Sequence, residues 1–198
     1  MRTLRPVVKV VPEVSPAVAV ALADVKSHLR VSWSDEDGKI EAYIAAALAL
    51  IDGPSGWLGR ALISQDWQHV CGGPDFGRVW LTGEPTEIVS ISYLDTDEAS
   101  QTLTPSDFRI HTDGFGWAVT PKTGVSWPSF ADRSDAMTIV YTTGFADAAD
   151  VPAPIKQAVS LLVGHWFKER EAATAVSLKE MPFAVSALLE NYKIGFTA

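Results

Sequence analysis

The sequence predicts an α+β fold: a helical bundle built from N- and C-terminal helices, with an inserted antiparallel β region. Apolar residues recur at helical spacing near both ends, in residues 37–51 and 151–171. Between them lie short runs of β-branched and aromatic residues, separated by Gly, Pro and Asp. We expect one domain over residues 1–198, divided into N-terminal helices (1–62), a β insertion (63–145), a central helix (151–171) and a C-terminal segment (182–198).

The N-terminal part begins with a short strand and two helices. Val7 to Val11 is rich in valine and ends at Pro12, which favours a strand. A short helix is expected from about Ala21. The next helix runs from Asp37 to Ile51, and Gly53 and Pro54 stop it. Its apolar stripe consists of Ile40, Tyr43, Ile44, Ala47, Leu48 and Ile51.

The other face of the helix 37–51 is made of alanine. No charged residue occurs between Glu41 and Asp52, whereas exposed helix faces normally carry charged and polar residues. This composition predicts close packing against another helix or another subunit. The residues concerned are Ala42, Ala45, Ala46 and Ala49.

The β region is predicted from runs that Gly, Pro and Asp clusters separate at the spacing of antiparallel structure. The runs are residues 63–70, 78–81, 88–94, 108–111, 117–120 and 137–142. Tryptophan and phenylalanine within them could stack on sugars, but they are more commonly core and edge residues of small sheets.

The central helix is apolar around most of its girth. Ile155, Ala158, Val159, Leu162 and Trp166 form one stripe, and neighbouring apolar residues widen it. On the back, Ser160 and Gly164 are small enough to allow close contact with another backbone. Two interpretations remain open: a core helix of a monomer, or a helix that also packs against another subunit.

The charge distribution disfavours nucleic-acid binding as the main activity. The net charge is −8, and residues 66–150 contain 13 acidic and 4 basic residues. An acidic surface repels phosphates. No apolar run approaches the ~18 residues that a membrane-spanning helix needs. The single cysteine, Cys71, cannot form an internal disulfide.

A secretion signal is weakly suggested and then disfavoured at the N-terminus. Arg2, Arg5 and Lys9 precede the apolar stretch SPAVAVALA. Glu13 and Pro16 interrupt the apolar stretch, so we do not expect secretion.

We find no catalytic constellation, metal site or cofactor motif in the sequence. A calcium loop around Asp35 to Gly38 would need an acid at Trp33 and a glutamate at Ile44. His69 and Cys71 are close in sequence, but no second cysteine completes a zinc site. We therefore expect no enzyme activity, no metal and no cofactor.

Motifs at both ends resemble phage head–tail connector proteins, also called adaptor or head-completion proteins, of long-tailed phages and gene transfer agents. The N-terminal motifs are ALADVKSHLRV, DEDGKIEAYIAAALALI and GRALISQDWQ. The C-terminal motifs are VPAPIKQAVSLLVGHWFKERE and MPFAVSALLENYK. They cover about half the chain, and their order and spacing are the specific part of the match. The family usually has Ser or Thr before the first helix, where this chain has Ala19 to Ala21.

The resemblance implies a virion protein of the neck, at the head–tail interface, assembled in the host cytoplasm. Copies would form a homo-oligomeric ring, commonly a dodecamer, under the portal protein, and would extend the DNA channel toward the stopper or tail-completion protein. DNA would pass without specific binding, and no membrane is involved. In this reading the acidic β region lines the channel or faces outward for solubility.

The resemblance also implies that residues 182–198 are an arm that docks on the portal. Its anchors would be apolar and aromatic side chains with one basic contact. They are Phe183, Leu188, Leu189, Tyr192, Lys193 and Phe196. The alternative for this segment is that it folds back on its own helices. The alternative for the whole chain is a carbohydrate- or receptor-binding β module of a phage particle.

Overall fold

The structure is a computed structural model, and it describes residues 7–10, 19–112, 114, 116–168 and 181–194. The chain divides into two compact units. One contains the β structure and is formed mainly by residues 64–144, and the other contains the helices and is formed by residues 15–63 and 145–194. The predicted α+β class is confirmed: the N- and C-terminal helices pack against one another, and the antiparallel strands lie between them in the sequence.

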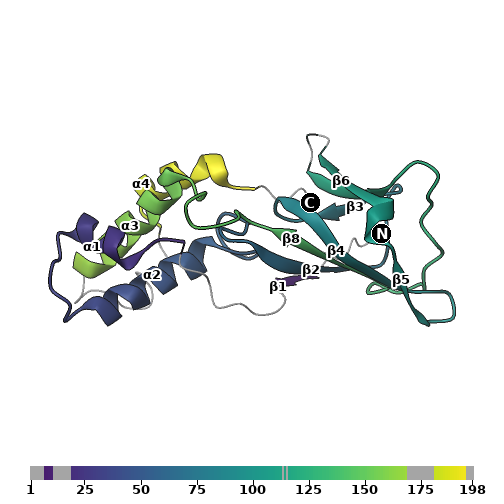
Figure 1. Cartoon of the computed structure of the whole chain (residues 1–198), viewed down its shortest axis with the longest axis horizontal. Helices are drawn as coiled ribbons and strands as arrows, with labels where there is room; N and C mark the ends of the chain where they lie inside the picture. Colours follow the sequence, from purple (N-terminus) through teal and green to yellow (C-terminus); the bar gives the residue numbers. More distant parts are fainter. Residues whose placement is uncertain (1–6, 11–18, 113, 115, 169–180, 195–198) are drawn as a thin grey trace. The chain divides into compact units, whose positions relative to one another are not determined.

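The helical unit contains α1 (Leu22–Leu29), α2 (Asp37–Ile51), α3 (Ala153–Lys168) and α4 (Phe183–Leu189), followed by the 3-10 turn η3 (Glu190–Tyr192). Figure 1 shows these elements grouped together. Helix α3 contacts α1, α2 and α4, so it is the centre of the unit. The predicted limits of α2 agree with the observed limits. The last residues of the predicted central helix, 169–171, lie outside the described residues.

The core of the helical unit comes from the predicted stripes. Ile40, Ile44, Leu48 and Ile51 of α2 are buried, as are Ile155, Ala158, Val159, Leu162 and Trp166 of α3. Ala19 and Val20, which precede α1, are also buried in this core. Ala19 and Val20 therefore contribute to the helical core.

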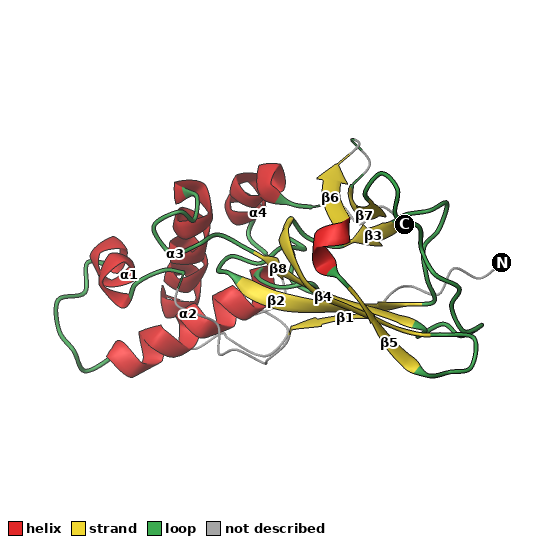
Figure 2. Cartoon of the chain, turned by 45° about the vertical axis from the view of Figure 1, so that its right-hand side comes forward, coloured by secondary structure: helices red, strands yellow, loops and turns green. Residues whose placement is uncertain are grey.

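The β unit contains two antiparallel sheets. The larger has the strand order β1-β2-β8-β4-β5 and the smaller has the order β3-β7-β6. The strands of the larger sheet are β1 (Val7–Val10), β2 (Gln65–Cys71), β8 (Met137–Thr143), β4 (Pro85–Leu94) and β5 (Ser100–Leu103). The smaller sheet consists of β3 (Val79–Leu81), β7 (Trp117–Pro121) and β6 (Phe108–Thr112), which follows the 3-10 turn η1 (Pro105–Asp107). Strand β8 lies between β2 and β4 in the larger sheet, whose strands are yellow in Figure 2.

Alternation along the central strand gives the larger sheet one buried face. In β8 the side chains of Met137, Ile139, Tyr141 and Thr143 are buried, and those between them are half-buried. Tyr141 pairs with Trp67 of β2, and their rings meet edge to face with centroids 6.4 Å apart. The Tyr141 hydroxyl donates a hydrogen bond of 2.9 Å to the Thr82 carbonyl oxygen. These contacts contribute to the buried face of the larger sheet.

Strand β5 was not predicted from the sequence. Three of its four residues are exposed, and its sequence, Ser-Gln-Thr-Leu, lacks the apolar alternation of a half-buried strand. Its pairing with β4, from Ile91–Leu103 to Leu94–Ser100, makes it a strand. The pairing with β4, and not the sequence of β5 itself, therefore makes this segment a strand.

Candidate interaction surfaces

The predicted alanine face of α2 is exposed in the chain. Ala42, Ala45, Ala46 and Ala49 are all exposed, while the opposite face of the helix is buried in the core. An exposed surface of small, uncharged side chains allows close approach of a second protein surface and gains little from remaining in water. Among the residues that the structure describes, no contact buries this face.

The predicted small-residue strip of α3 has a different place. Gly164 is buried, and a β-carbon added there would lie 3.5 Å from Leu29 Cδ2 and 3.7 Å from His28 Nε2, both of α1. Ser160 is 6% exposed, and its hydroxyl donates a hydrogen bond to the Lys156 carbonyl oxygen. The close helix contact at Gly164 is thus made inside the helical unit.

The described part of the C-terminal segment lies on the helices of its own unit. Leu189 is fully buried, and Val185 is nearly so. The Ile194 amide donates a hydrogen bond of 2.8 Å to the Leu58 carbonyl oxygen. The Arg60 guanidinium donates one of 3.3 Å to the Tyr192 carbonyl oxygen. Leu189 therefore holds α4 in place and is not accessible to a partner in this conformation.

The other predicted anchors differ in accessibility. Phe183, the first residue of α4, is 88% exposed. Leu188 and Tyr192 are half-buried, and Lys193 is exposed with its Nζ 4.5 Å from the centre of the Trp57 ring. Phe196 lies outside the described residues. The assignment of these side chains to portal binding stays a prediction.

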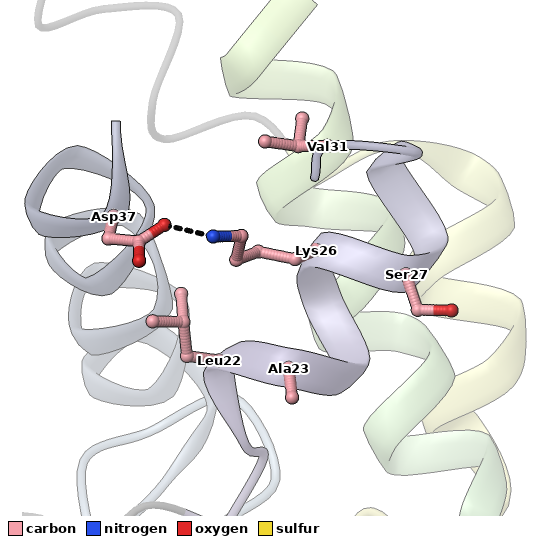
Figure 3. A pocket seen from close by; sticks show the side chains of 6 residues that line it. All are labelled: Leu22, Ala23, Lys26, Ser27, Val31 and Asp37. Carbon is pink, nitrogen blue, oxygen red and sulfur yellow. Dashed lines mark hydrogen bonds and ion pairs between the residues drawn. The ribbon is translucent and has the colours of Figure 1, made fainter. Parts of the chain in front are cut away.

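An open groove lies where α1 meets the start of α2. Leu22, Ala23, Lys26, Ser27 and Val31 line it together with Asp37. Figure 3 shows Lys26 reaching from α1 to Asp37, with which it forms an ion pair. Asp37 is in the first turn of α2, where the helix dipole also favours a carboxylate. The pair joins α1 to α2.

Burial shifts the pKa values of both members of the H-x-C pair in β2, His69 and Cys71. His69 is 2% exposed, and burial lowers its pKa to about 4, so the imidazole is neutral near pH 7. Burial raises the pKa of the Cys71 thiol, which disfavours the reactive thiolate. Among the described residues, no three His, Cys, Asp or Glu side chains are grouped so that they could hold a metal ion. Within those same ranges, no helix is long and apolar enough to span a membrane.

The tryptophans of the β unit are engaged within the unit. Trp67 is buried, and the Arg78 guanidinium lies over the Trp80 ring, 5.4 Å from its centre. Trp127 donates a hydrogen bond of 2.8 Å from its Nε1 to the Gly77 carbonyl oxygen. Trp117 is half-buried. None of these four rings is presented as an open platform for a sugar, which disfavours the carbohydrate-binding alternative.

The exposed side chain of Phe76 was not predicted from the sequence. Phe76 is 95% exposed and has a φ angle of +47°, which is unusual for any residue other than glycine. The signal that could have identified the turn is the segment Asp75-Phe76-Gly77-Arg78, in which Asp and Gly are typical of a tight hairpin.

The profile of the family described as "HCP: Head completion protein" matches residues 20–194, almost the whole chain. The chain belongs to the head completion protein family. Family membership agrees with the motifs that the sequence analysis identified at both ends.

Solved structures show the same fold. A chain from a structure described as the neck of an empty GTA particle, computed with C6 symmetry, has 24% sequence identity and a TM-score of 0.73, covering 97% of each chain. A second, from the neck of a native GTA particle computed with C12 symmetry, has 22% identity and a TM-score of 0.71, again over 97% of each chain. A third, from the virion of a native gene transfer agent particle, has 23% identity and a TM-score of 0.72, over 96% of this chain and 97% of the other. A search of curated proteins finds no match.

Proposed function

We propose that this head completion protein is an adaptor in the neck of a phage-like particle or gene transfer agent. Copies form a ring under the portal, extend the DNA channel and join the DNA-filled capsid to the tail. Family membership supports a role in completing the head. Solved structures with the same fold include chains of necks described with C6 and C12 symmetry, which supports a ring.

The exposed alanine face of α2 is the observation that carries ring formation. Helices pack at short distances when the side chains between them are small, and an uncharged face has few groups to desolvate. Here Ala42, Ala45, Ala46 and Ala49 are exposed together. We assign this face to contact between neighbouring copies in the ring.

A charged residue in this face tests the assignment. Ala45→Glu places a carboxylate in the proposed interface, so we expect ring formation to be lost while the monomer keeps its fold, because Ala45 is exposed. Ala153→Glu is the matched control, since Ala153 is the exposed first residue of α3 and the helix dipole favours an acid there. Light scattering and electron microscopy, with and without portal, measure the outcome. Rings of Ala45→Glu as abundant as those of the unchanged protein would refute the assignment.

We propose that the C-terminal segment also contacts the portal, through Phe183 and the exposed side of α4. The exposure of Phe183 supports this role, because an accessible aromatic side chain is a common anchor of protein contacts. Deletion of residues 182–198 would also remove Leu189 from the core. A loss of portal binding by that variant could then result from misfolding alone. Phe183→Ser avoids this problem.

We expect Phe183→Ser to weaken portal binding by at least about tenfold, with ring formation and thermal stability unchanged. Ala187→Ser, also exposed on α4, is the control. Surface-immobilised portal and a concentration series of each variant give the affinities. Equal affinity of Phe183→Ser and unchanged protein would leave the helix α4 without its proposed role.

The acidic β region is proposed to line the DNA channel, where negative charge keeps phosphates from adhering. Residues 66–150 contain 13 acidic and 4 basic residues, which supports this role. Particles carrying neutralised acids should then retain or release DNA abnormally. Normal DNA retention and ejection in such particles would assign the acids to solubility instead.

A further inference from the structure

The tip of the β2–β3 connection is a two-residue hairpin turn with an aromatic residue in an unfavourable position. The Asp75 amide donates to the Arg78 carbonyl at 2.8 Å, and the Arg78 amide donates to the Asp75 carbonyl at 3.0 Å. Phe76 and Gly77 between them have φ angles of +47° and +78°. Turns with two positive φ angles prefer Asn, Asp or Gly at the first position. Phenylalanine there costs stability of the order of 1 kcal/mol.

No contact within the described residues recovers this cost, because the Phe76 side chain is 95% exposed. A residue that is unfavourable both for its backbone and for its contact with water indicates a role outside the chain. Asparagine at this position would satisfy the turn better than phenylalanine does.

The turn is held firmly from its base. The Trp127 indole donates a hydrogen bond of 2.8 Å to the Gly77 carbonyl oxygen. The Trp127 ring in turn lies 4.6 Å from the Phe108 ring and 6.3 Å from the Phe130 ring, measured between centroids. A braced turn presents Phe76 in one backbone conformation, so little conformational entropy is lost when a partner covers it.

The charge of the surrounding unit selects the kind of partner. Residues 64–144, the main part of this unit, contain 11 acidic and 4 basic residues, which disfavour DNA and disfavour the same acidic unit of a second copy. They favour an apolar recess with Lys and Arg at its rim, on a different protein. The proposed portal contact already uses α4 in the helical unit, so the occupant is a further neighbour in the neck.

We infer that Phe76 is a preformed aromatic anchor that inserts into a basic-rimmed apolar recess of a neck protein other than the portal and other than this chain. This inference rests on the proposed adaptor function. The test uses the stopper, which is the neck protein on the side away from the portal, as the purified binding partner.

Phe76→Asn separates binding from folding, because asparagine suits the turn better than phenylalanine. We expect the variant to fold with equal or higher thermal stability, to form rings and to bind portal normally. Its affinity for purified stopper should fall by at least about tenfold. Phe76→Tyr keeps the ring and should retain binding. Raising the salt concentration should weaken stopper binding of the unchanged protein.

Each other outcome overturns the inference. Equal stopper affinity of Phe76→Asn and unchanged protein, or no stopper binding by unchanged rings, removes the proposed contact. Loss of rings in Phe76→Asn identifies a second copy as the occupant, and loss of portal binding identifies the portal. Failure of the unchanged protein to form rings or bind portal refutes the adaptor function itself, which is a separate result.

Discussion

The side chains of His69 and Trp67 lie on the buried side of β2, and each has a buried polar nitrogen. Trp67 Nε1 and His69 Nδ1 have no hydrogen-bond partner among the described residues. A buried imidazole without a partner for its proton is held in the neutral form, because charging it there costs desolvation energy. The histidine that the sequence presented as half of an H-x-C pair is thus a core residue.

This burial makes stability depend on pH. The pKa of His69 is about 4 in the folded chain and near 6.5 when unfolded, so the unfolded state binds the proton first as the pH falls. Stability is therefore lost progressively between about pH 6.5 and pH 4, by up to about 3 kcal/mol from this group. Urea unfolding at several pH values measures the loss.

His69→Leu is the comparison, since other groups titrate in the same range. The difference in unfolding free energy between the two proteins should change by most of this amount between pH 7 and pH 4.5. Parallel pH profiles of the two proteins would show that His69 does not titrate as its burial predicts.

At the scale of elements, α3 is the framework of the helical unit, and Gly164 is where α1 crosses it closely. A β-carbon at Gly164 would meet Leu29 Cδ2 at 3.5 Å, an ordinary contact. Gly164→Ala should thus raise stability by about 0.5–1 kcal/mol, because alanine restricts the unfolded chain. Gly164→Leu should lower it by about 1–3 kcal/mol through overpacking against α1.

Thermal unfolding of these variants provides the measurement, with Lys168→Leu as the exposed control on the same helix. An equal effect of leucine at positions 164 and 168 would mean that α1 is not packed on Gly164.

The position of helix α4 in the helical unit depends on the buried side chain of Leu189. Leu189 is fully buried, so Leu189→Ala should lower stability by about 2–5 kcal/mol and release α4 from the unit. Amide hydrogen exchange in residues 183–192 should then accelerate, because α4 is short and depends on its packing. Phe183→Ala, at an exposed position, should leave exchange as it was. Slow exchange in Leu189→Ala would contradict the docked position of α4.

At the scale of the molecule, the net charge distinguishes a protein that lets DNA pass from one that binds DNA. The net charge of −8 predicts no measurable retention of duplex DNA at about 0.15 M salt. Glu87→Gln, Asp97→Asn and Asp132→Asn together remove three exposed acids of the β unit. Gel-shift titration should show no binding by the unchanged protein and, at low salt only, weak binding by the triple variant. Tight binding by the unchanged protein would contradict a passive channel wall.

The sequence alone determined the elements whose apolar pattern is long and local. The limits of α2 follow from its stripe and from Gly53 and Pro54, and the core residues of α3 follow from its spacing. Most strands were found because half of their residues face a core. The family motifs at the two ends predicted that those ends belong together.

Tertiary structure decided what depends on residues distant in sequence. Strand β5 exists because β4 supplies its hydrogen bonds, and Gly164 is covered because Leu29 and His28 reach it from α1. The alanines of α2 and Leu189 of α4 look alike as helix-face residues in the sequence, yet the alanines are exposed and Leu189 is buried. Periodicity fixes which side of an element is apolar, whereas only the packing of all elements decides which of those sides remain uncovered.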